Sequence, residues 1–158
     1  MAGRQDTKLE SEGAEFLVCG HLLIEAIPSY KTYTQMPGYD IIATNPELGF
    51  NARIQVKSRW ATDGDGGFLI KNFNADFVVL ALLNRGYRFT KKNADPSSGK
   101  LSPAFYILPI EVVRLAQNKK SKLGKVLLRK IEKSEQYRDA WHLIGQFLKK
   151  KRVNKTVN

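Results

Sequence analysis

The chain has 158 residues, of which 42% are hydrophobic and 26% charged, so one compact domain with a hydrophobic core is expected. Its single cysteine, Cys19, excludes a disulfide framework within the chain. The longest apolar stretch, residues 14–27, is interrupted by Glu15, His21 and Glu25, which excludes a membrane span or a signal peptide. These features together predict a cytoplasmic protein.

The formal net charge of +11 is concentrated in the C-terminal part of the sequence. Residues 1–113 carry 12 Lys and Arg against 12 Asp and Glu, whereas residues 114–158 carry 14 against 3. A basic part joined to a neutral part predicts a polyanionic partner, usually nucleic acid, although a solvated surface with a basic tail is the alternative. A membrane partner is not expected, because the basic segments lack an exposed aromatic face.

Hydrophobic periodicity predicts a helix over residues 8–27. Apolar residues recur in it at intervals of three, four and seven, at Leu9, Phe16, Leu17, Leu23 and Ile24. Alternating side chains predict two short strands after the helix, over residues 30–35 and 39–44, separated by a turn at Pro37 and Gly38.

The remaining elements are expected to complete an α/β sandwich with a mixed sheet. They are strands at 52–60, 76–83 and 105–108, a flexible segment at 63–67, and helices at 109–116, 123–133 and 136–150. Residues 84–103 form a long polar stretch, part of which is expected to extend a hairpin. We expect one domain over residues 1–150, basic and helical from about residue 114, followed by a disordered basic tail over residues 151–158.

The stretch most informative about function joins residues 37–40 (Pro-Gly-Tyr-Asp) to residues 54–58 (Ile-Gln-Val-Lys-Ser) through one loop. Two adjacent strands would bring Asp40 near Gln55 and Lys57 on one face. The hydrophobic pattern supports this, because successive side chains of a strand point to opposite faces and the alternating apolar residues require the other face.

These residue types suit metal-assisted cleavage of a phosphodiester bond. Mg²⁺ and Mn²⁺ prefer hard oxygen ligands, which the Asp40 carboxylate, the Gln55 amide and the Val56 backbone carbonyl can supply. A lysine on the same strand, Lys57, can place a positive charge near the attacking water and the scissile phosphate. Taken singly, Asp40 could instead cap a loop, and Lys57 could be a solvated lysine at a sheet edge.

In these motifs and in the order of its elements, about the first 115 residues of the chain resemble the PD-(D/E)XK nuclease superfamily. In that superfamily a β-hairpin carries the aspartate and then the (D/E)XK triplet, flanked by helices. The resemblance implies a restriction-endonuclease-like α/β/α sandwich with extra C-terminal helices, an endonuclease that hydrolyses DNA with Mg or Mn, and possible assembly as a homodimer. It also implies that Asp40 binds metal and that Lys57 assists the nucleophile.

The pattern of Ser11, Glu15 and Val18 in the first helix resembles that of archaeal Holliday junction resolvases and small homing endonucleases. Those enzymes place a metal-site glutamate there, which implies this role for Glu15. Glu15 heads an apolar stripe and is expected to point inward, where a carboxylate needs a partner or a metal. Glu12, one turn earlier, is the rival candidate.

Two positions depart from the superfamily's motif. Gln55 stands where an acidic residue is usual, and Tyr39 precedes Asp40 where the motif has proline. Glutamine is a neutral and weaker ligand, so the metal affinity is expected to fall unless Glu15 compensates. Active members with a Gln-x-Lys motif are known in the superfamily.

Several cations are candidates for contacts with nucleic-acid phosphates: Arg59, Lys71, Lys149, Lys150, Lys151 and Arg152. Cys19, His21 and His142 are too widely separated to predict a zinc site, and residues 63–67 lack the later ligands of a calcium loop. Two other functional hypotheses remain open. One is a nucleic-acid-binding module with a degenerate site on the same fold, and the other is a protein-interaction subunit.

Overall fold

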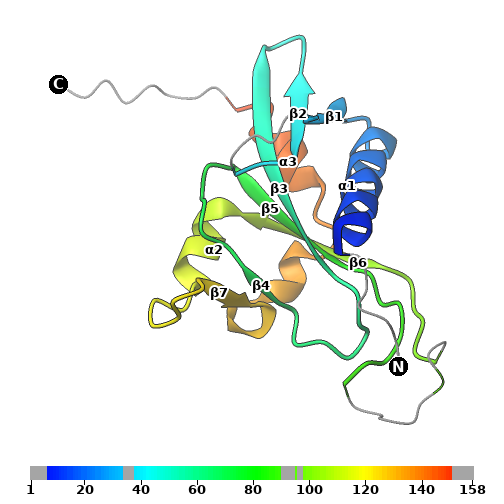
Figure 1. The fold of residues 1–158 in the computed structure, drawn as a ribbon. Helices are drawn as coiled ribbons and strands as arrows, with labels where there is room; N and C mark the ends of the chain where they lie inside the picture. The colour runs from blue at the N-terminus through cyan, green and yellow to red at the C-terminus, as the bar shows by residue number, and fades with distance from the viewer. Residues whose placement is uncertain (1–6, 34–37, 90–94, 96–97, 151–158) are drawn as a thin grey trace.

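The computed structural model describes residues 7–33, 38–89, 95 and 98–150. Its helices and strands follow one another from a long N-terminal helix to a short C-terminal one (Figure 1). In chain order they are α1 (Thr7–Ile24), β1 (Ser29–Lys31), β2 (Ile41–Asn45), β3 (Phe50–Arg59), β4 (Gly67–Leu69), β5 (Phe77–Leu82), β6 (Ala104–Pro109), α2 (Ile110–Ala116), β7 (Lys125–Leu127), the 3₁₀ helices η1 (Leu128–Lys130) and η2 (Ser134–Tyr137), and α3 (His142–Phe147).

A five-stranded mixed sheet in the order β1-β2-β3-β5-β6 forms the centre of the molecule. Strands β3 and β5 are parallel, and the other neighbouring pairs are antiparallel. β5 is almost entirely buried, as its unbroken apolar sequence predicts for a strand covered on both faces. A separate two-stranded sheet pairs β4 with β7.

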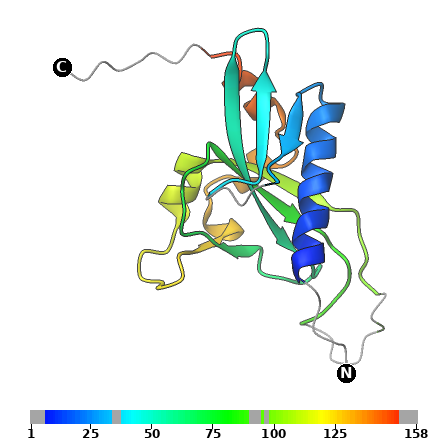
Figure 2. The same cartoon turned by 45° about the horizontal axis from the view of Figure 1, so that its top comes forward.

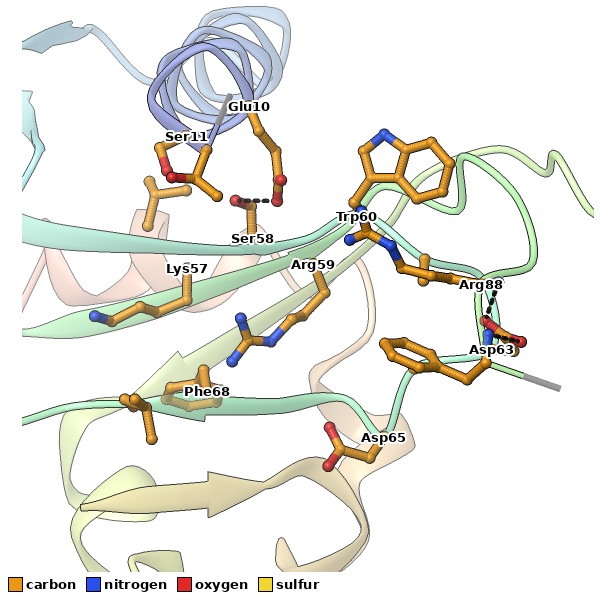
Figure 3. A pocket seen from close by; sticks show the side chains of 16 residues that line it. Glu10, Ser11, Lys57, Ser58, Arg59, Trp60, Asp63, Asp65, Phe68 and Arg88 are labelled. Carbon is orange, nitrogen blue, oxygen red and sulfur yellow. Dashed lines mark hydrogen bonds between the residues drawn. The ribbon is translucent and has the colours of Figure 1, made fainter. Parts of the chain in front are cut away.

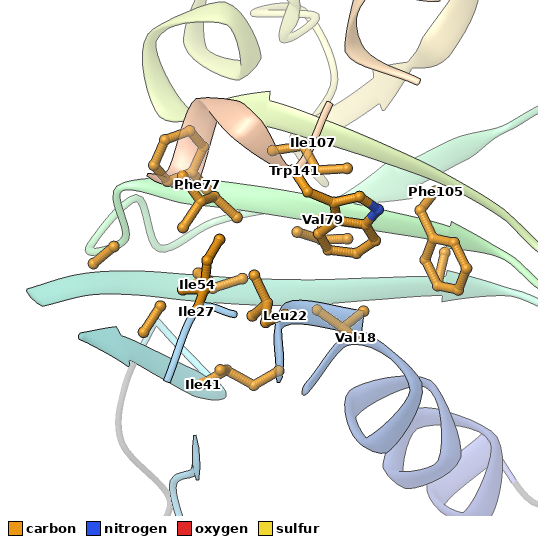
Figure 4. Packing of buried hydrophobic residues seen from close by; sticks show 14 of the residues in the cluster. Val18, Leu22, Ile27, Ile41, Ile54, Phe77, Val79, Phe105, Ile107 and Trp141 are labelled. Carbon is orange, nitrogen blue, oxygen red and sulfur yellow. The ribbon is translucent and has the colours of Figure 1, made fainter. Parts of the chain in front are cut away.

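Two hydrophobic cores lie on opposite faces of the central sheet, so the molecule has three layers (Figure 2). Helices α1 and α3 cover one face, where Val18 and Leu22 pack with Ile54, Val79 and Trp141 (Figure 4). Helix α2 and the β4–β7 pair cover the other face, with Phe68, Val78, Leu80, Val113 and Val126 in that core. This arrangement confirms the predicted α/β/α sandwich.

The face of α1 that packs on the sheet is not the one that the apolar periodicity emphasises. Ala14, Val18 and Leu22 are buried. The five large apolar residues that predicted the helix are instead exposed: Leu9, Phe16, Leu17, Leu23 and Ile24. A helix in this position fits closely against the sheet through small and medium side chains, which leaves its larger residues on the outer surface.

The C-terminal part differs most from its predicted structure. The helix expected over 123–133 is wrong, because these residues form β7 and η1. Gly124 has a φ of +65° and ends any helical turn there, and Val126 is buried between half-buried neighbours as a strand requires. The helix expected over 136–150 is reduced to α3, because Asp139 has a φ of +49° and the chain crosses there from one core to the other.

Smaller differences concern strand ends and the loops. β1 is shorter than the strand predicted over 30–35, and β4 was not predicted at all. The polar stretch 84–103 does extend the β5–β6 hairpin, through the bridge between Arg85 and Lys100. Residues 34–37 of the predicted strand and turn, and the predicted tail at 151–158, lie outside the described residues. Among the residues that the structure describes, no helix is long and apolar enough to cross a membrane.

Shortening a side chain on the inward face of α1 should lower the free energy of unfolding more than shortening one on its outward face. Leu22→Ala should lower the free energy of unfolding by about 2–5 kcal/mol, because a fully buried leucine leaves a cavity. Leu23→Ala, at a residue that is 54% exposed, should change it by less than about 0.5 kcal/mol. Urea denaturation of both variants measures the difference, and equal losses would contradict the assignment of the core face.

Candidate functional site

Asp40 lies just before strand β2 begins and is hydrogen-bonded to strand β3. The regular pairing of the two strands ends at Ile41 and Ile54. The Asp40 N–H donates to the Ile54 carbonyl at 2.8 Å, and the Val56 N–H donates to Asp40 Oδ2 at 2.8 Å. The Asp40 carboxylate therefore accepts the hydrogen bond of the Val56 N–H, which a backbone carbonyl would accept if β2 were longer.

Gln55 and Lys57 share one face of β3, as the alternating pattern predicts. Their neighbours on β5 are Val78 and Leu80, which belong to the core beneath α2 and the β4–β7 pair. Ile54 is fully buried in the other core, with α1. The structure thus brings Asp40, Gln55 and Lys57 together at one end of the β2–β3 hairpin.

Beyond this point β3 continues without β2. β2 pairs with β3 only as far as Ile54, whereas β3 extends to Arg59. Backbone groups alternate in direction along a strand, so the Val56 carbonyl points to the same edge as the Val56 N–H that reaches Asp40. The Val56 carbonyl oxygen therefore points to the edge of β3 at which the Asp40 carboxylate is bound.

The side-chain oxygen of Gln55 is buried without a partner. Gln55 Oε1 accepts no hydrogen bond from any residue that the structure describes. A buried amide oxygen left unpaired costs free energy, so such an atom calls for a donor or a cation. A side-chain amide oxygen is among the hard oxygen ligands that a divalent cation accepts.

Burial governs the ionisation of Asp40 and Lys57. It raises the pKa of the Asp40 carboxyl above its ordinary value, against the Val56 hydrogen bond and the positive charges of Lys57 and Lys31, which lower it. Burial lowers the pKa of Lys57, and the charge of Arg59 lowers it further, while Asp40 opposes the shift. An additional charge of opposite sign near either group would stabilise its ionised form.

Glu15 reaches the same region from α1 and shares a buried ammonium with Glu12. The Lys31 side chain is 4% exposed, and its Nζ lies 3.2 Å from Glu15 Oε2, contacts Glu12 Oε1 and stands 4.1 Å above the Phe16 ring. Burial and the negative charge of Asp40 raise the pKa of Glu15, although Lys31 opposes this. Glu15 is also the less exposed of the two glutamates, at 19% against 54%.

Lys31 is the site residue that sequence reasoning missed. Burial lowers its pKa, but the hydrogen bonds to Glu12 and Glu15 outweigh this and raise the pKa above its ordinary value. Its signal was present in the alternation of β1, which points Ser29 and Lys31 inward and Tyr30 outward. A lysine on the inner face of an edge strand requires acidic partners, and α1 supplies two.

A cleft of about 780 Å³ opens beside Lys57, along the free edge of β3. Its lining includes three cations and three aromatic rings: Lys57, Arg59, Arg88, Trp60, Phe68 and Phe89. Figure 3 shows Lys57 and Arg59 extending between β3 and the strand that carries Phe68, with Trp60 and Arg88 side by side at the far end. The Arg88 guanidinium lies 5.6 Å from the centre of the Trp60 ring.

The acidic groups of the cleft are occupied by donors of the protein itself. Asp63 accepts the N–H groups of Arg88 and Phe89, both at 2.9 Å, and so ties two walls together. Asp65 accepts from Gly67 N–H and pairs with Lys125 at 2.8 Å, which holds its pKa below the ordinary value. Glu10, the third acidic residue of the lining, accepts a hydrogen bond from Ser58 Oγ. The segment predicted to be flexible over 63–67 is therefore anchored, and the three acids of the lining equal its three cations in number.

The other predicted phosphate contacts are dispersed. Arg59 lines the cleft and donates to the Gly67 carbonyl. Lys71 is exposed on the segment between β4 and β5. Lys149 and Lys150 follow α3, where Asn45 at the far end of β2 holds the Leu148 carbonyl, so they lie away from Asp40. Lys151 and Arg152 lie outside the described residues.

The acidic and metal-ligating side chains of the described residues are dispersed. In the described part of the chain, no three side chains of His, Cys, Asp or Glu cluster closely enough to hold a metal ion. His21 stacks on Trp141 with ring centres 5.3 Å apart, and Cys19 lies 3.5 Å from Ser29 Oγ, which agrees with the packing roles expected for both. A cation at the candidate site would thus rely on two carboxylates, from Glu15 and Asp40, with neutral oxygens from Gln55 and Val56.

No protein-family model and no curated protein matches the sequence. The structure is similar to that of a bacterial homing endonuclease, I-Ssp6803I, with a TM-score of 0.53 and 22% identity over 90% of this chain and 94% of that chain. Archaeoglobus fulgidus Hjc, a Holliday junction resolvase from an archaeal hyperthermophile, gives a TM-score of 0.48 and 16% identity over 77% and 87%. The first likeness confirms the restriction-endonuclease-like fold, a mixed five-stranded sheet with helices on both sides.

The buried ammonium of Lys31 predicts a stability test. Lys31→Met should lower the free energy of unfolding by about 2 kcal/mol or more, because it leaves Glu15 buried without its counter-charge. Lys125→Met is the matched control, since Lys125 forms an ion pair in which both side chains are more than 40% exposed, and it should cost less than about 1 kcal/mol. Chemical denaturation compares the two, and a loss in Lys31→Met no larger than in the control would contradict the role.

Proposed function

We propose that the chain is a metal-dependent endonuclease that hydrolyses phosphodiester bonds of DNA at the Asp40–Lys57 site. The observation that carries the proposal is the buried, unpaired Gln55 Oε1 on β3, next in the chain to Val56, whose N–H holds the Asp40 carboxylate. The fold shared with a homing endonuclease and the three cations of the adjoining cleft support it.

The metal would be Mg²⁺ or Mn²⁺, held by the Asp40 carboxylate, the Gln55 amide oxygen and the Val56 carbonyl, with Glu15 completing the set. When bound, such a cation polarises the phosphate and makes water a better nucleophile. The residues fit this role because Asp40 and Glu15 both have pKa values raised by burial, which a divalent charge would reverse.

Lys57 would assist the attack on the phosphate. Its ammonium is on the face of β3 that carries Gln55, at the mouth of the cleft. There it can orient the attacking water and offset the negative charge that develops on the phosphate oxygens. Burial lowers the pKa of Lys57, whereas the neighbouring charge of Asp40 opposes this shift and favours the ammonium.

The cleft would hold the nucleotide next to the scissile bond. Arg59 and Arg88 supply positive charge, and Trp60 and Phe89 supply flat apolar surface. This combination suits the phosphate and the base of one nucleotide. A duplex is too wide to enter a space of this size, so its backbone would lie across the opening.

One observation favours a second candidate, a DNA-binding module without activity. The site offers only two carboxylates among the described residues, and the third side-chain ligand is neutral. Nicking of plasmid DNA with Mg²⁺ or Mn²⁺ separates the two functions. DNA binding that weakens with salt separates both from a protein-interaction subunit, because displaced counterions make contacts with phosphates sensitive to salt.

Lys57→Ala should lower the rate of plasmid nicking on the order of 100-fold or more, because it removes a charge that acts on the transition state. DNA affinity, measured by fluorescence anisotropy, should change little. Lys130→Ala, at an exposed position remote from β3, is the control and should keep both properties. An unchanged rate of nicking by a folded Lys57→Ala variant would contradict the proposed active site.

If Gln55 is a metal ligand, substitutions at this position should change the affinity for Mn²⁺. Gln55→Glu should tighten Mn²⁺ binding, because it supplies a charged oxygen at the same place. Gln55→Ala should weaken it on the order of tenfold or more. Titration calorimetry gives the affinities, and melting temperatures show whether either variant is misfolded. The same Mn²⁺ affinity in all three proteins would rule out the ligand role and favour the binding module.

A further inference from the structure

Helix α1 has two apolar faces, and only one of them packs on the sheet. The inward face carries Ala14, Val18 and Leu22. The outward face carries five large side chains with high exposed fractions: Leu9 72%, Phe16 55%, Leu17 42%, Leu23 54% and Ile24 80%. Figures 1 and 2 show α1 at the side of the molecule. Of the five residues, Phe16 also contacts the Lys31 ammonium with its ring. An amphipathic helix normally has one apolar stripe, so a second one calls for a partner.

Two glycines interrupt the outward face. A Cβ added at Gly13 or Gly20 would meet nothing within 4 Å, so no contact within the chain requires glycine at either position. Glycine in the middle of a helix also weakens the helix relative to alanine. A different benefit must explain the pair, and glycine on a helix surface allows another backbone to approach closely.

The outward face is symmetric about the middle of the helix. Relative to a point between Phe16 and Leu17, Gly13 and Gly20 lie at equal distances, and so do Leu9 and Ile24. An antiparallel copy of the same helix would therefore set Phe16 against Leu17, Leu9 against Ile24 and Gly13 against Gly20, while Leu23 would correspond to Glu10 at the border of the face. This is the pattern that an isologous two-fold interface requires, since the same patch must fit itself.

We propose that a second copy of this chain docks on the outward face of α1, antiparallel to it, with a two-fold axis passing between Phe16 and Leu17. The five exposed fractions correspond to roughly 500 Å² of apolar surface per copy, at the upper end of patches on monomeric proteins. Two copies would bury about 1,000 Å² through these side chains alone, which reaches the lower bound for a specific interface.

The charge around this face argues against nucleic acid as its occupant. α1 carries Glu10, Glu12, Glu15 and, just beyond its end, Glu25, whereas the basic excess lies after residue 113. The face would repel phosphates. Two copies with a net charge of +11 also repel each other at long range, so added salt should strengthen the dimer while it weakens contacts with DNA.

Sedimentation equilibrium of the full chain, over a range of concentrations and at two salt levels, measures the assembly directly. We expect a reversible dimer that is favoured by salt. Leu17→Glu and Ile24→Glu should each weaken it at least tenfold, because each buries a carboxylate in an apolar contact. Leu115→Glu is the control, since Leu115 is 89% exposed on α2, outside the outward face of α1. A chain that stays monomeric throughout, or a dimer indifferent to the first two variants, would overturn the proposal.

Disulfide trapping tests the register, in a Cys19→Ala background. Leu17→Cys places a thiol beside the axis, about 1.5 Å along the helix from its own copy, and should cross-link rapidly on mild oxidation. Leu9→Cys lies on the same face but would be about 22 Å along the helix from its copy, and should not cross-link. Equal trapping of both variants, or faster trapping of Leu9→Cys, would refute the antiparallel pairing. Circular dichroism confirms that each variant is folded.

Discussion

The hydrogen bond from the Val56 N–H to the Asp40 carboxylate determines how strands β2 and β3 part. A side chain takes the place of the next residue of β2, so the sheet loses a strand partner without leaving the Val56 donor unpaired. The edge of β3 beyond this bond is open, and the cleft lies along it. The same bond holds the Asp40 carboxylate at Val56, which lies between Gln55 and Lys57 in the chain. The site and the cleft beside it therefore both follow from one substitution: the Asp40 carboxylate, rather than a backbone carbonyl of β2, accepts the hydrogen bond of the Val56 N–H.

Much of the N-terminal half could be predicted because its signals are local. Alternation along β3 separates Ile54 from Gln55 and Lys57, and the sheet keeps that separation. The apolar run of β5 predicts a strand buried on both faces, and Pro109 precedes the helix that begins at Ile110. The position of Asp40 next to this strand was predicted as well, since two adjacent strands joined by a short turn have few possible registers.

The remainder depends on contacts between distant residues, which no local pattern records. Residues 125–127 lie among residues that favour a helix, but they form β7. They pair with β4, and the core beneath α2 buries Val126. Lys31 appears solvated in the sequence, and only α1 packed across β1 shows that two glutamates enclose its ammonium. The unpaired state of Gln55 Oε1 is likewise a property of the assembled site.

The contact between the two ends of the described chain has a consequence for synthesis on the ribosome. His21 of α1 contacts both Phe105 and Trp141, with ring centres 4.6 Å and 5.3 Å away. Helix α1 is made before either of these aromatic partners, so this part of the core closes only after residue 141 has emerged. Until then the apolar surface that Trp141 covers is open to contacts with other chains, which favours aggregation during synthesis.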